Sequence, residues 1–373
     1  MLVDATAVPA DRGGVGRYVD GLVAALGKAG ADLALVCQRS DIDRYGKLAP
    51  NAQFVPGPAA ISHRPARLAW EQTGIAEVAD HVGADVIHSP HYTMPLRAGR
   101  PVVVTIHDLT FFTEPSMHVA VKGTFYRSAT RTAARRAARI IVPSKATRDE
   151  LVRVLNVDAT EVDVAYHGVD TDLFHVPSLA ERERVSARLC LGDRRYVAFL
   201  GTLEPRKNVP ALVRGWVEAV RREDDPPALV LAGGTGWDLE VDAAVAAVPE
   251  ELTVLRPGYL RFADLPGFLG GATVVAYPSF GEGFGLPVLE AMACGAPVLT
   301  TPRLSLPEVG GDAVAYTQPD AEAIAHNLSA LLADAPRRAA LGAAGHARAI
   351  EFTWAASAEA HLASYELAAR AGR

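Results

Sequence analysis

Short runs of apolar, β-branched residues alternate along this chain with longer segments rich in alanine and leucine. This alternation is typical of βαβ units built around a parallel sheet, so the sequence predicts an α/β fold. A first series of predicted strands comprises residues 3–8, 32–36, 86–88, 102–106, 140–142 and 162–165. A second series comprises residues 196–200, 228–231, 252–255, 274–277 and 298–300.

The two series predict two doubly wound, Rossmann-like domains, since 373 residues exceed what one hydrophobic core usually supports. Residues 170–193 are mixed and charged and contain Pro177, and we expect them to form the linker. The predicted domains are therefore 1–172 and 173–352. Residues 1–175 carry 19 basic and 19 acidic side chains and the remainder 18 and 24, so the net charge of −6 lies in the second half.

Composition excludes several classes of protein. A net charge of −6 argues against bulk nucleic-acid binding. Three cysteines lie far apart without metal-ligand spacing, which predicts a reducing compartment and neither a disulfide framework nor a zinc site. The chain shows no secretory leader and no run of about 18 apolar residues, so we expect a cytoplasmic protein that does not span a membrane.

The most informative segment places two glutamates eight positions apart, Glu282 and Glu290, across a glycine-rich turn that opens a helix. A buried strand is predicted before this turn, and Pro287 suits the first helical turn, where its missing N–H costs nothing. The backbone N–H groups of residues 284–286 would then form a positive helix end suited to a phosphate or a sugar oxygen. Because carboxylates accept hydrogen bonds from sugar and ribose hydroxyls, the segment indicates a nucleotide-sugar site.

A second segment, residues 201–208, follows the predicted strand 196–200 and contains Arg206 and Lys207. Both would lie at the carboxyl edge of the second sheet. A guanidinium and an ammonium there would stabilise the negative charge that develops on a departing diphosphate. No Asp-x-Asp motif lies near this predicted donor pocket, so we expect no cofactor and no requirement for a divalent metal.

Six segments in this order resemble the retaining glycosyltransferases of family four, which have the two-domain GT-B fold, and the likeness spans nearly the whole chain. They are residues 13–18, 107–108, 144–145, 167–170, 201–208 and 282–290. The resemblance implies two Rossmann-like domains facing each other across a cleft. It implies an acceptor-binding N-terminal domain, a donor-binding C-terminal domain and a final helix, about 353–373, that returns to the first domain.

The resemblance also assigns roles to individual residues. Arg206 and Lys207 would hold the diphosphate, Glu282 the hydroxyls of the transferred sugar, and Glu290 the ribose. The base would pack on Tyr259 or Leu260. The remaining donor-binding positions implied are Gly14, Gly16, Gly283, Phe284, Gly285 and Leu286.

In the N-terminal domain the resemblance implies a catalytic role for His107, whose imidazole would donate to a sugar hydroxyl or whose carbonyl would lie beneath the reacting carbon. Asp108 would either fix the tautomer of His107 or bind the acceptor. Arg17 and Tyr18 would also bind the acceptor. The glycines near residue 14 also resemble a dinucleotide fingerprint. Their spacing and the separation from the preceding strand depart from that pattern, which argues against NAD.

The resemblance implies front-face substitution, in which the departing diphosphate takes the proton of the acceptor. GDP-mannose is the leading donor and a UDP-hexose the alternative, with a glycan or lipid-linked acceptor in cell-surface polysaccharide or glycolipid synthesis. Two other classes use the same fold: a sugar 2-epimerase, and a catalytically silent subunit that binds a nucleotide-sugar.

The segment 115–148 contains eight basic residues and no acidic one. Arg127, Arg131 and Arg135 recur every four residues and predict one stripe on a helix, with Lys122 near its start. Such a stripe is either a solvated face or a surface that docks on anionic lipid, which would place the enzyme peripherally on the inner face of the membrane.

Overall fold

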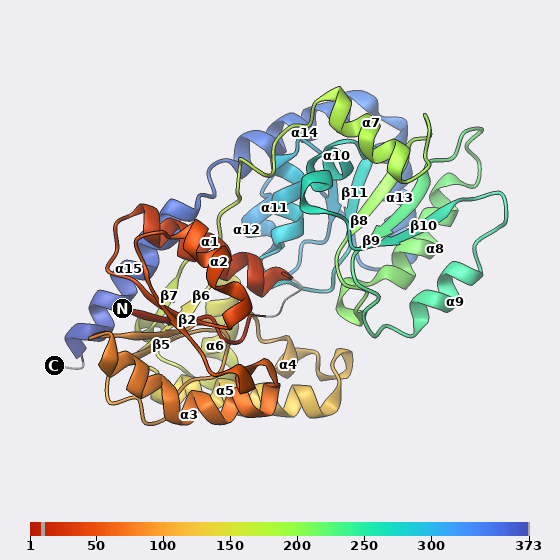
Figure 1. Ribbon diagram of the computed structural model, residues 1–373. Helices are drawn as coiled ribbons and strands as arrows, with labels where there is room; N and C mark the ends of the chain where they lie inside the picture. Colours follow the sequence, from red (N-terminus) through yellow and green to blue (C-terminus); the bar gives the residue numbers. More distant parts are fainter. Residues whose placement is uncertain (9–11, 372–373) are drawn as a thin grey trace. The chain divides into compact units, whose positions relative to one another are not determined.

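The computed structural model describes residues 1–8 and 12–371 (Figure 1). The chain divides into two compact units. Unit 1 comprises Met1–Gly168 and Thr353–Arg373, and unit 2 comprises Val169–Phe352. The chain therefore leaves unit 1 at Gly168, slightly before the predicted end at residue 172, and returns to it at the predicted residue 353.

In the described part of unit 1, seven strands form a wholly parallel sheet of order β3-β2-β1-β4-β5-β6-β7. The strands are β1 Leu2–Asp4, β2 Ala34–Cys37, β3 Gln53–Pro56, β4 Ile87–Ser89, β5 Val102–Thr105, β6 Arg139–Val142 and β7 Val162–Val164. The helices are α1 Gly14–Lys28, α2 Ile42–Leu48, α3 Arg64–His81, α4 Thr110–Thr113, α5 Ala120–Arg136, α6 Lys145–Leu155 and α15 Trp354–Ala371. The winding direction changes between β1 and β4.

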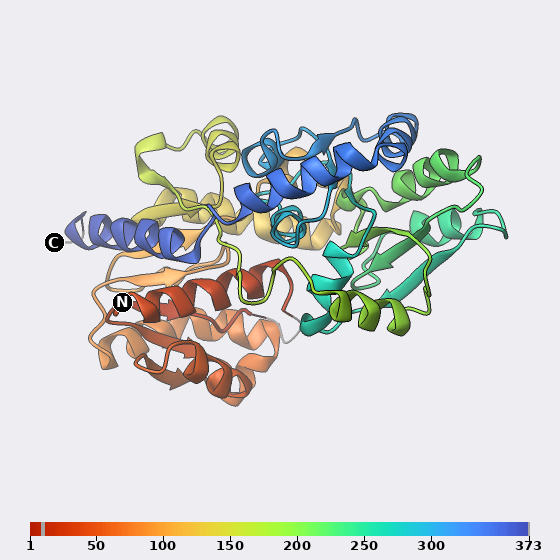
Figure 2. The same cartoon turned by 90° about the horizontal axis from the view of Figure 1, so that it is seen from above.

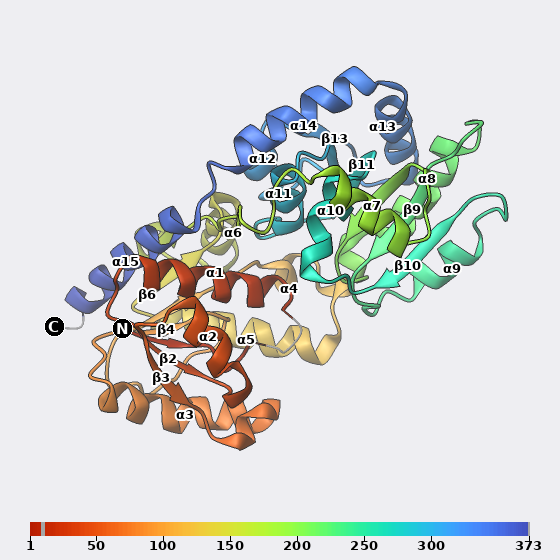
Figure 3. The ribbon, with the colours of Figure 1, turned by 45° about the horizontal axis from the view of Figure 1, so that its top comes forward.

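Both faces of this sheet are buried, which explains why its strands read as continuous apolar runs. Leu2, Val36 and Val104 belong to a core that includes residues of α3, α5 and α6. Their neighbours Val3 and Val103 point to the opposite face, into a core that includes residues of α1, α2 and α15. Figures 1 and 3 show these two layers of helices around the sheet.

Helix α15 belongs to unit 1 and is tied to its sheet by a chain of buried hydrogen bonds. His361 Nδ1 lies 2.7 Å from the Ser357 carbonyl, which can only accept, so Nδ1 carries the hydrogen. Burial lowers the pKa of His361 to about 4, so the ring is neutral at pH 7 and Nε2 accepts from the Tyr18 hydroxyl at 2.8 Å. Tyr18 lies on α1, and this bond joins the last helix to the first.

The same series of hydrogen bonds continues from α1 into the strands of the sheet. The Thr105 hydroxyl donates to the Tyr18 oxygen at 2.8 Å and accepts from His88 Nε2 at 2.8 Å. His88 Nδ1 accepts from the Tyr365 hydroxyl, again at 2.8 Å, which leads back to α15. Tyr18, Thr105, His88 and His361 thereby each have one donor and one acceptor role, as an apolar interior requires.

The described part of unit 2 contains a six-stranded parallel sheet of order β10-β9-β8-β11-β12-β13. Its strands are β8 Tyr196–Leu200, β9 Ala228–Ala232, β10 Val254–Gly258, β11 Val274–Tyr277, β12 Val298–Thr300 and β13 Ala315–Tyr316. Its helices are α7 Leu179–Arg188, α8 Val209–Val220, α9 Glu240–Ala246, α10 Leu265–Gly270, α11 Leu286–Ala293, α12 Leu306–Gly310, α13 Ala321–Ala333 and α14 Ala335–Ala349. The winding direction changes between β8 and β11.

Glycines permit close helix packing in unit 2. A Cβ on Gly215 of α8 would lie 2.7 Å from Ile324 of α13, and one on Gly342 of α14 would lie 2.4 Å from the Gly295 carbonyl just after α11. Figure 2 shows α14 and α15 following one another at the end of the chain.

The strand predictions hold for both series, and three features differ from expectation. The predicted linker contains helix α7, which begins with a capping box between Ser178 and Glu181 that the charged composition concealed. The first strand ends at Asp4 and does not continue to residue 8. Two edge strands, β3 and β13, were not predicted, because one is only partly buried and the other spans two residues.

Candidate active site

In unit 2 the carboxyl ends of β8 and β11 lie side by side at the point where the winding direction changes. Open α/β sheets bind their ligands at this point. After β8 the chain forms a 3-10 turn, Pro205–Lys207, and after β11 it forms a loop that leads into α11. The two loops are joined because Phe280 N–H donates to the Arg206 carbonyl at 2.9 Å.

These loops bring Arg206, Lys207 and Glu282 together. Arg206 donates to Glu282 Oε2 at 2.5 Å and to the Gly281 carbonyl at 2.7 Å. Lys207 Nζ lies 2.7 Å from Glu282 Oε1. The lysine and the glutamate are 8% and 6% exposed, so this is a buried ion-pair cluster. All three residues were predicted to lie in one site, but the contacts among them were not predicted.

The cluster fixes the charge of Glu282. Burial would raise the pKa of this carboxyl, but Arg206 and Lys207, with hydrogen bonds from Lys207 and Ser279, hold it at about 2. Burial and the adjacent Arg206 lower the pKa of Lys207, against the opposing effect of Glu282. One carboxylate thus serves as counter-ion to two cations.

Three further residues of the cluster were missed from the sequence. The Tyr277 hydroxyl lies 2.5 Å from Lys207 Nζ and 3.1 Å from Glu282 Oε1, and its ring lies beneath the ammonium at 5.0 Å. The Ser279 hydroxyl donates to Glu282 at 2.7 Å, and Glu204 accepts from Arg206 at 2.7 Å. Their positions, at the end of β11 and just before the basic pair, were the available signal.

Helix α11 begins as predicted, with Pro287 in its first turn. Gly285 is its N-cap, at φ 101°, and a Cβ there would also lie 2.8 Å from Leu306, so glycine is required. In the described residues the N–H groups of Gly285 and Leu286 have no acceptor. Glu290 lies on α11 and is 2% exposed.

A glycine-rich turn after β9, residues 233–236, forms another part of this edge and was not singled out from the sequence. A Cβ on Gly233 would lie 2.1 Å from the Gly201 carbonyl, and one on Gly234 would lie 2.6 Å from the Tyr259 hydroxyl. Tyr259 is 66% exposed and follows β10. The strand β10 ends at Gly258, three residues beyond the predicted end at residue 255.

In unit 1, His107 follows β5 and is half-buried. Its Nε2 donates to the Pro90 carbonyl at 2.8 Å, and burial lowers its pKa, so the neutral ring presents Nδ1 as an acceptor. Asp108 does not fix this tautomer, which was one of its two predicted roles, and its role in acceptor binding stays a prediction. Its Oδ1 accepts from the backbone and hydroxyl of Thr110, which starts α4.

Three other predicted residues of unit 1 have different surroundings from those expected. Tyr18 is fully buried in the chain of hydrogen bonds to α15, so its side chain is not available to an acceptor. Gly14 and Gly16 lie inside the first turn of α1, after the N-cap Gly13, rather than in a loop before it. Arg17, in the same turn, is half-buried.

The predicted basic stripe lies on α5. Arg131 and Arg135 are exposed, whereas Lys122 and Arg127 are half-buried. Arg127 donates to the Phe111 carbonyl at 2.9 Å, and Arg131 lies over the Phe112 ring at 5.1 Å. These two arginines therefore also support α4. Among the described helices, none is both long enough and apolar enough to cross a bilayer.

Comparison with known proteins agrees with this geometry. Residues 12–173 match the model of Glycosyltransferase Family 4, and residues 194–334 match that of Glycosyl transferases group 1. The chain is 33% identical over 307 residues to O-antigen chain mannosyltransferase B of Escherichia coli, covering 81% of this chain and 78% of the relative. It is 30% identical to alpha-maltose-1-phosphate synthase of Mycolicibacterium smegmatis, covering 95% of each.

Solved structures share the fold. The glycosyltransferase WaaG, involved in lipopolysaccharide biosynthesis, aligns with a TM-score of 0.77 at 14% identity, over 98% of this chain and 99% of that one. HepE of Anabaena, in complex with UDP and glucose, aligns with a TM-score of 0.76 at 18% identity, over 98% of each. The chain belongs to glycosyltransferase family four and has the GT-B fold, with two parallel α/β sheets and a returning C-terminal helix.

Proposed function

We propose that this glycosyltransferase moves a hexose from a nucleotide-diphosphate sugar to a glycan or lipid-linked acceptor in the synthesis of cell-surface polysaccharide or glycolipid, with retention of configuration. The observation that carries the proposal is the convergence of Arg206 and Lys207 on Glu282 where the winding of the unit 2 sheet changes. Two cations at this edge suit the two negative groups of a diphosphate.

The ion pairs suggest how the donor would bind. In the described residues Glu282 and Glu204 neutralise Arg206 and Lys207. A bound diphosphate would become the new counter-ion of the cations, and Glu282 would then turn part of its hydrogen-bonding capacity to the hydroxyls of the sugar. As the glycosidic bond breaks, charge on the departing diphosphate increases and its attraction to the cations strengthens.

The remaining parts of the edge suit the rest of the donor. The N–H groups at the start of α11 favour a phosphate oxygen, and Glu290 is the candidate for the ribose. The exposed Tyr259 ring, close to Gly234, is the candidate surface for the base.

GDP-mannose is the leading donor, and its support is the likeness to an O-antigen chain mannosyltransferase. A UDP-hexose is the alternative, and its support is the likeness in fold to a protein crystallised with UDP-glucose. Because the two cations occupy the position where many transferases use a metal ion, we propose that no divalent metal is required.

We also propose that unit 1 docks reversibly on anionic membranes through the start and exposed side of α5. Val119 and Val121, 53% and 82% exposed, lie beside Lys122 at this end, and Arg131 and Arg135 follow along the helix. Such docking would bring a cytoplasmic enzyme to a lipid-linked acceptor.

One experiment separates transfer from the other activities of this fold. Radiolabelled GDP-mannose or UDP-hexose is incubated with the enzyme alone and then with lipid-linked glycan. The proposal predicts product only when the acceptor is present. Free nucleotide and free sugar formed at the same rate without acceptor would indicate an epimerase or hydrolase, and donor binding without turnover would indicate a silent subunit.

A further inference from the structure

The unit 1 sheet has its own change of winding direction, between β1 and β4, and polar side chains gather there. Asp4 ends β1, and His91 follows β4. Helix α3, which leads into β4, carries Arg64 and Arg67 in its first turn. A parallel sheet opens a crevice at such a point, so these residues occupy the position where the fold places a ligand.

A buried ion pair holds one of these arginines. Arg67 is 7% exposed and donates through one nitrogen, Nη1, to Glu71 at 2.8 Å. Glu71 also accepts from the Thr93 hydroxyl at 2.7 Å and from Gln72 at 3.1 Å, so its oxygens are already used. In the described residues no other acceptor lies within hydrogen-bonding distance of Arg67, which leaves N–H groups of a fixed guanidinium for a ligand.

His91 has a buried ring nitrogen that is also available to a ligand. Its Nε2 lies 3.1 Å from the Tyr126 hydroxyl, while Nδ1 is buried and has no partner in the described part of the chain. The next residue, Tyr92, adopts the left-handed conformation, with φ 58°, although it is not glycine. An unsatisfied buried nitrogen beside a non-glycine residue in a sparsely populated backbone conformation is typical of a binding site.

Arg64 adds a charge that no carboxylate of the described residues pairs with. Its guanidinium lies over the rings of Phe125 and Tyr126, at 5.2 and 5.5 Å, and the side chain is exposed. Stacking on two rings fixes the guanidinium without using its N–H groups.

The local field is positive. Burial lowers the pKa of His91 well below its ordinary value, and so do nearby charges, among them Arg67, Arg64 and Lys122. Two carboxyls face the same cluster, Asp4 and Glu71, and burial raises the pKa of each. The three cations Arg64, Arg67 and Lys122 therefore outnumber the two carboxyls. One of the carboxyls, Glu71, is already paired with Arg67.

We propose that this cluster binds an oxyanion carried by the acceptor, a phosphoryl or carboxylate group, through Arg64, the unused N–H groups of Arg67 and Nδ1–H of His91. The inference rests on the proposed function, since it supposes that unit 1 receives the acceptor. It narrows the acceptor to an anionic glycan or glycan phosphate, and it makes Arg64 a residue that determines acceptor specificity.

The test uses the full chain with its donor site saturated by the nucleoside diphosphate that binds it, so that added anions do not report on Arg206 and Lys207. Methyl phosphate, methyl glucuronide and neutral methyl mannoside are titrated at constant ionic strength. The signal followed is the imidazole carbon-bound hydrogen of His91 by NMR, assigned from its disappearance in His91→Gln. Methyl phosphate and methyl glucuronide distinguish the two sources of the oxyanion.

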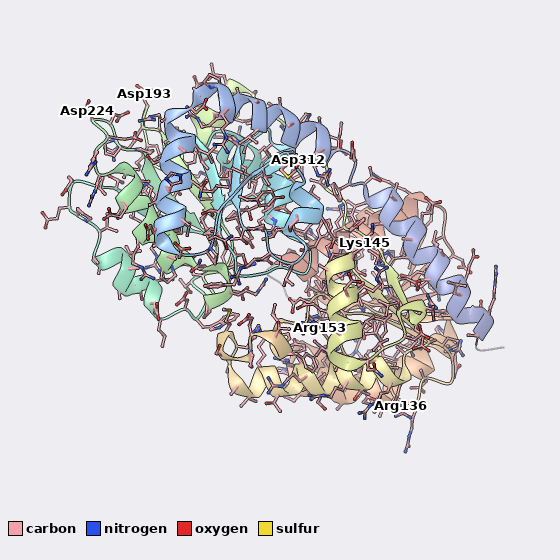
Figure 4. The ribbon with its side chains drawn as sticks, turned by 180° about the vertical axis from the view of Figure 1, so that it is seen from behind. Arg136, Lys145, Arg153, Asp193, Asp224 and Asp312 are labelled. Atoms are coloured by element: carbon pink, nitrogen blue, oxygen red, sulfur yellow. The ribbon has the colours of Figure 1, made fainter. Side chains whose placement is uncertain are left out.

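We expect at least one anion, and not methyl mannoside, to shift the His91 signal. Arg64→Gln should weaken that binding about tenfold, as expected for the loss of one charge-assisted contact. Arg136→Gln is the matched control. Arg136 is exposed and is the last residue of α5 (Figure 4), whereas Arg64 lies over Phe125 and Tyr126, nearer the start of that helix. The Arg136→Gln variant should bind the anion as the parent does.

Arg64 is exposed, so its replacement should not prevent folding. The inference is overturned if neither anion shifts the His91 signal, or if Arg64→Gln binds the anion as tightly as the parent. Nucleotide binding, measured beforehand by calorimetry, tests the proposed function separately. If no nucleotide binds, the anions can still be titrated into the Arg206→Ala variant without nucleotide, and the His91 signal still reports on the unit 1 cluster.

Discussion

The ammonium of Lys207 lies 2.7 Å from Oε1 of Glu282, in a buried site where Arg206 holds the other oxygen of the same carboxylate at 2.5 Å. The donor's diphosphate and Glu282 would therefore compete for the same cations. We therefore expect Glu282 to oppose nucleotide binding while it supports sugar transfer, whereas Arg206 and Lys207 support both.

Replacement of the two glutamates should separate their roles. Glu282→Gln removes the competing counter-ion, so affinity for the bare nucleoside diphosphate should be retained or increase, while transfer falls because the sugar loses its partner. Glu290→Gln should weaken binding of the bare nucleotide by about 1.5–3 kcal/mol, the scale of one hydrogen bond to a charged group. Calorimetry with GDP and UDP decides between them. Weaker nucleotide binding by Glu282→Gln than by Glu290→Gln would reverse the assignment.

Loss of either cation should reduce catalysis. Arg206→Ala or Lys207→Ala should lower kcat/KM by an amount equivalent to about 2–4 kcal/mol, the scale of one transition-state donor. Lys207→Ala should also lower the free energy of unfolding, because it removes one of the two cations paired with a buried carboxylate. Arg221→Ala is the control, since its pair with Glu218 is exposed. Activity abolished by EDTA and restored by manganese would contradict a metal-free clamp.

The sequence identified the strands and the glycine turn of unit 2 because their signals are local. Apolar runs of strand length, Pro287 and the position of Arg206 after a strand could all be recognised without tertiary structure. The partners of Glu282 could not, since Lys207 and Tyr277 approach it only when β8 and β11 pair. The pattern of apolar and polar residues predicts which residues lie at the edge of a sheet. It does not predict which of those residues contact one another.

The sequence failed differently in unit 1. Tyr18 occurs in a segment that resembles the acceptor region, yet its hydroxyl is used by Thr105 and His361. His361 lies 343 positions away in sequence, and no local pattern could indicate that bond. Arg67 and Glu71 lie four positions apart, the spacing of an ordinary ion pair on a helix surface, and only their burial in the structure distinguishes them.

Acid should weaken the attachment of α15. The pKa of His361 is 6.5 in the unfolded chain and about 4 in the folded chain. Between these two pH values His361 is therefore protonated in the unfolded chain and neutral in the folded chain. Its stabilising contribution is complete above pH 6.5 and is lost as the pH falls toward 4. Between about pH 7 and pH 5 this one group should reduce the free energy of unfolding by about 2 kcal/mol.

Urea unfolding of the parent and of His361→Gln at the two pH values tests this. Glutamine does not titrate, so the variant should lose about 2 kcal/mol less than the parent on acidification. Four other histidines whose pKa values are lowered in the same direction remain in both proteins, namely His88, His91, His107 and His167. An identical loss in both proteins would show that His361 is not a source of the acid sensitivity.

Membrane docking should be electrostatic and reversible. The parent should sediment with phosphatidylglycerol vesicles at low salt and be released near about 0.5 M salt by screening. Arg131→Gln with Arg135→Gln should weaken sedimentation, each arginine contributing about 1 kcal/mol. These two are preferred to Arg127, whose bond to the Phe111 carbonyl supports the fold.

The matched control for docking is Lys28→Gln with Arg39→Gln, which removes the same charge from exposed positions on other elements of unit 1. It should sediment as the parent does. Equal sedimentation by the α5 double variant and the parent would show that the basic stripe is only a solvated face.

The measurement that tests the central claim most directly is calorimetric titration of GDP-mannose and a panel of UDP-hexoses into the parent and into Lys207→Ala. We predict that the parent binds one of these donors, GDP-mannose first, without added metal, and that Lys207→Ala binds the same donor at least about tenfold more weakly. A parent that binds none of them, or a Lys207→Ala variant that binds the donor as tightly as the parent, would contradict the assignment of this cluster as the nucleotide-sugar site.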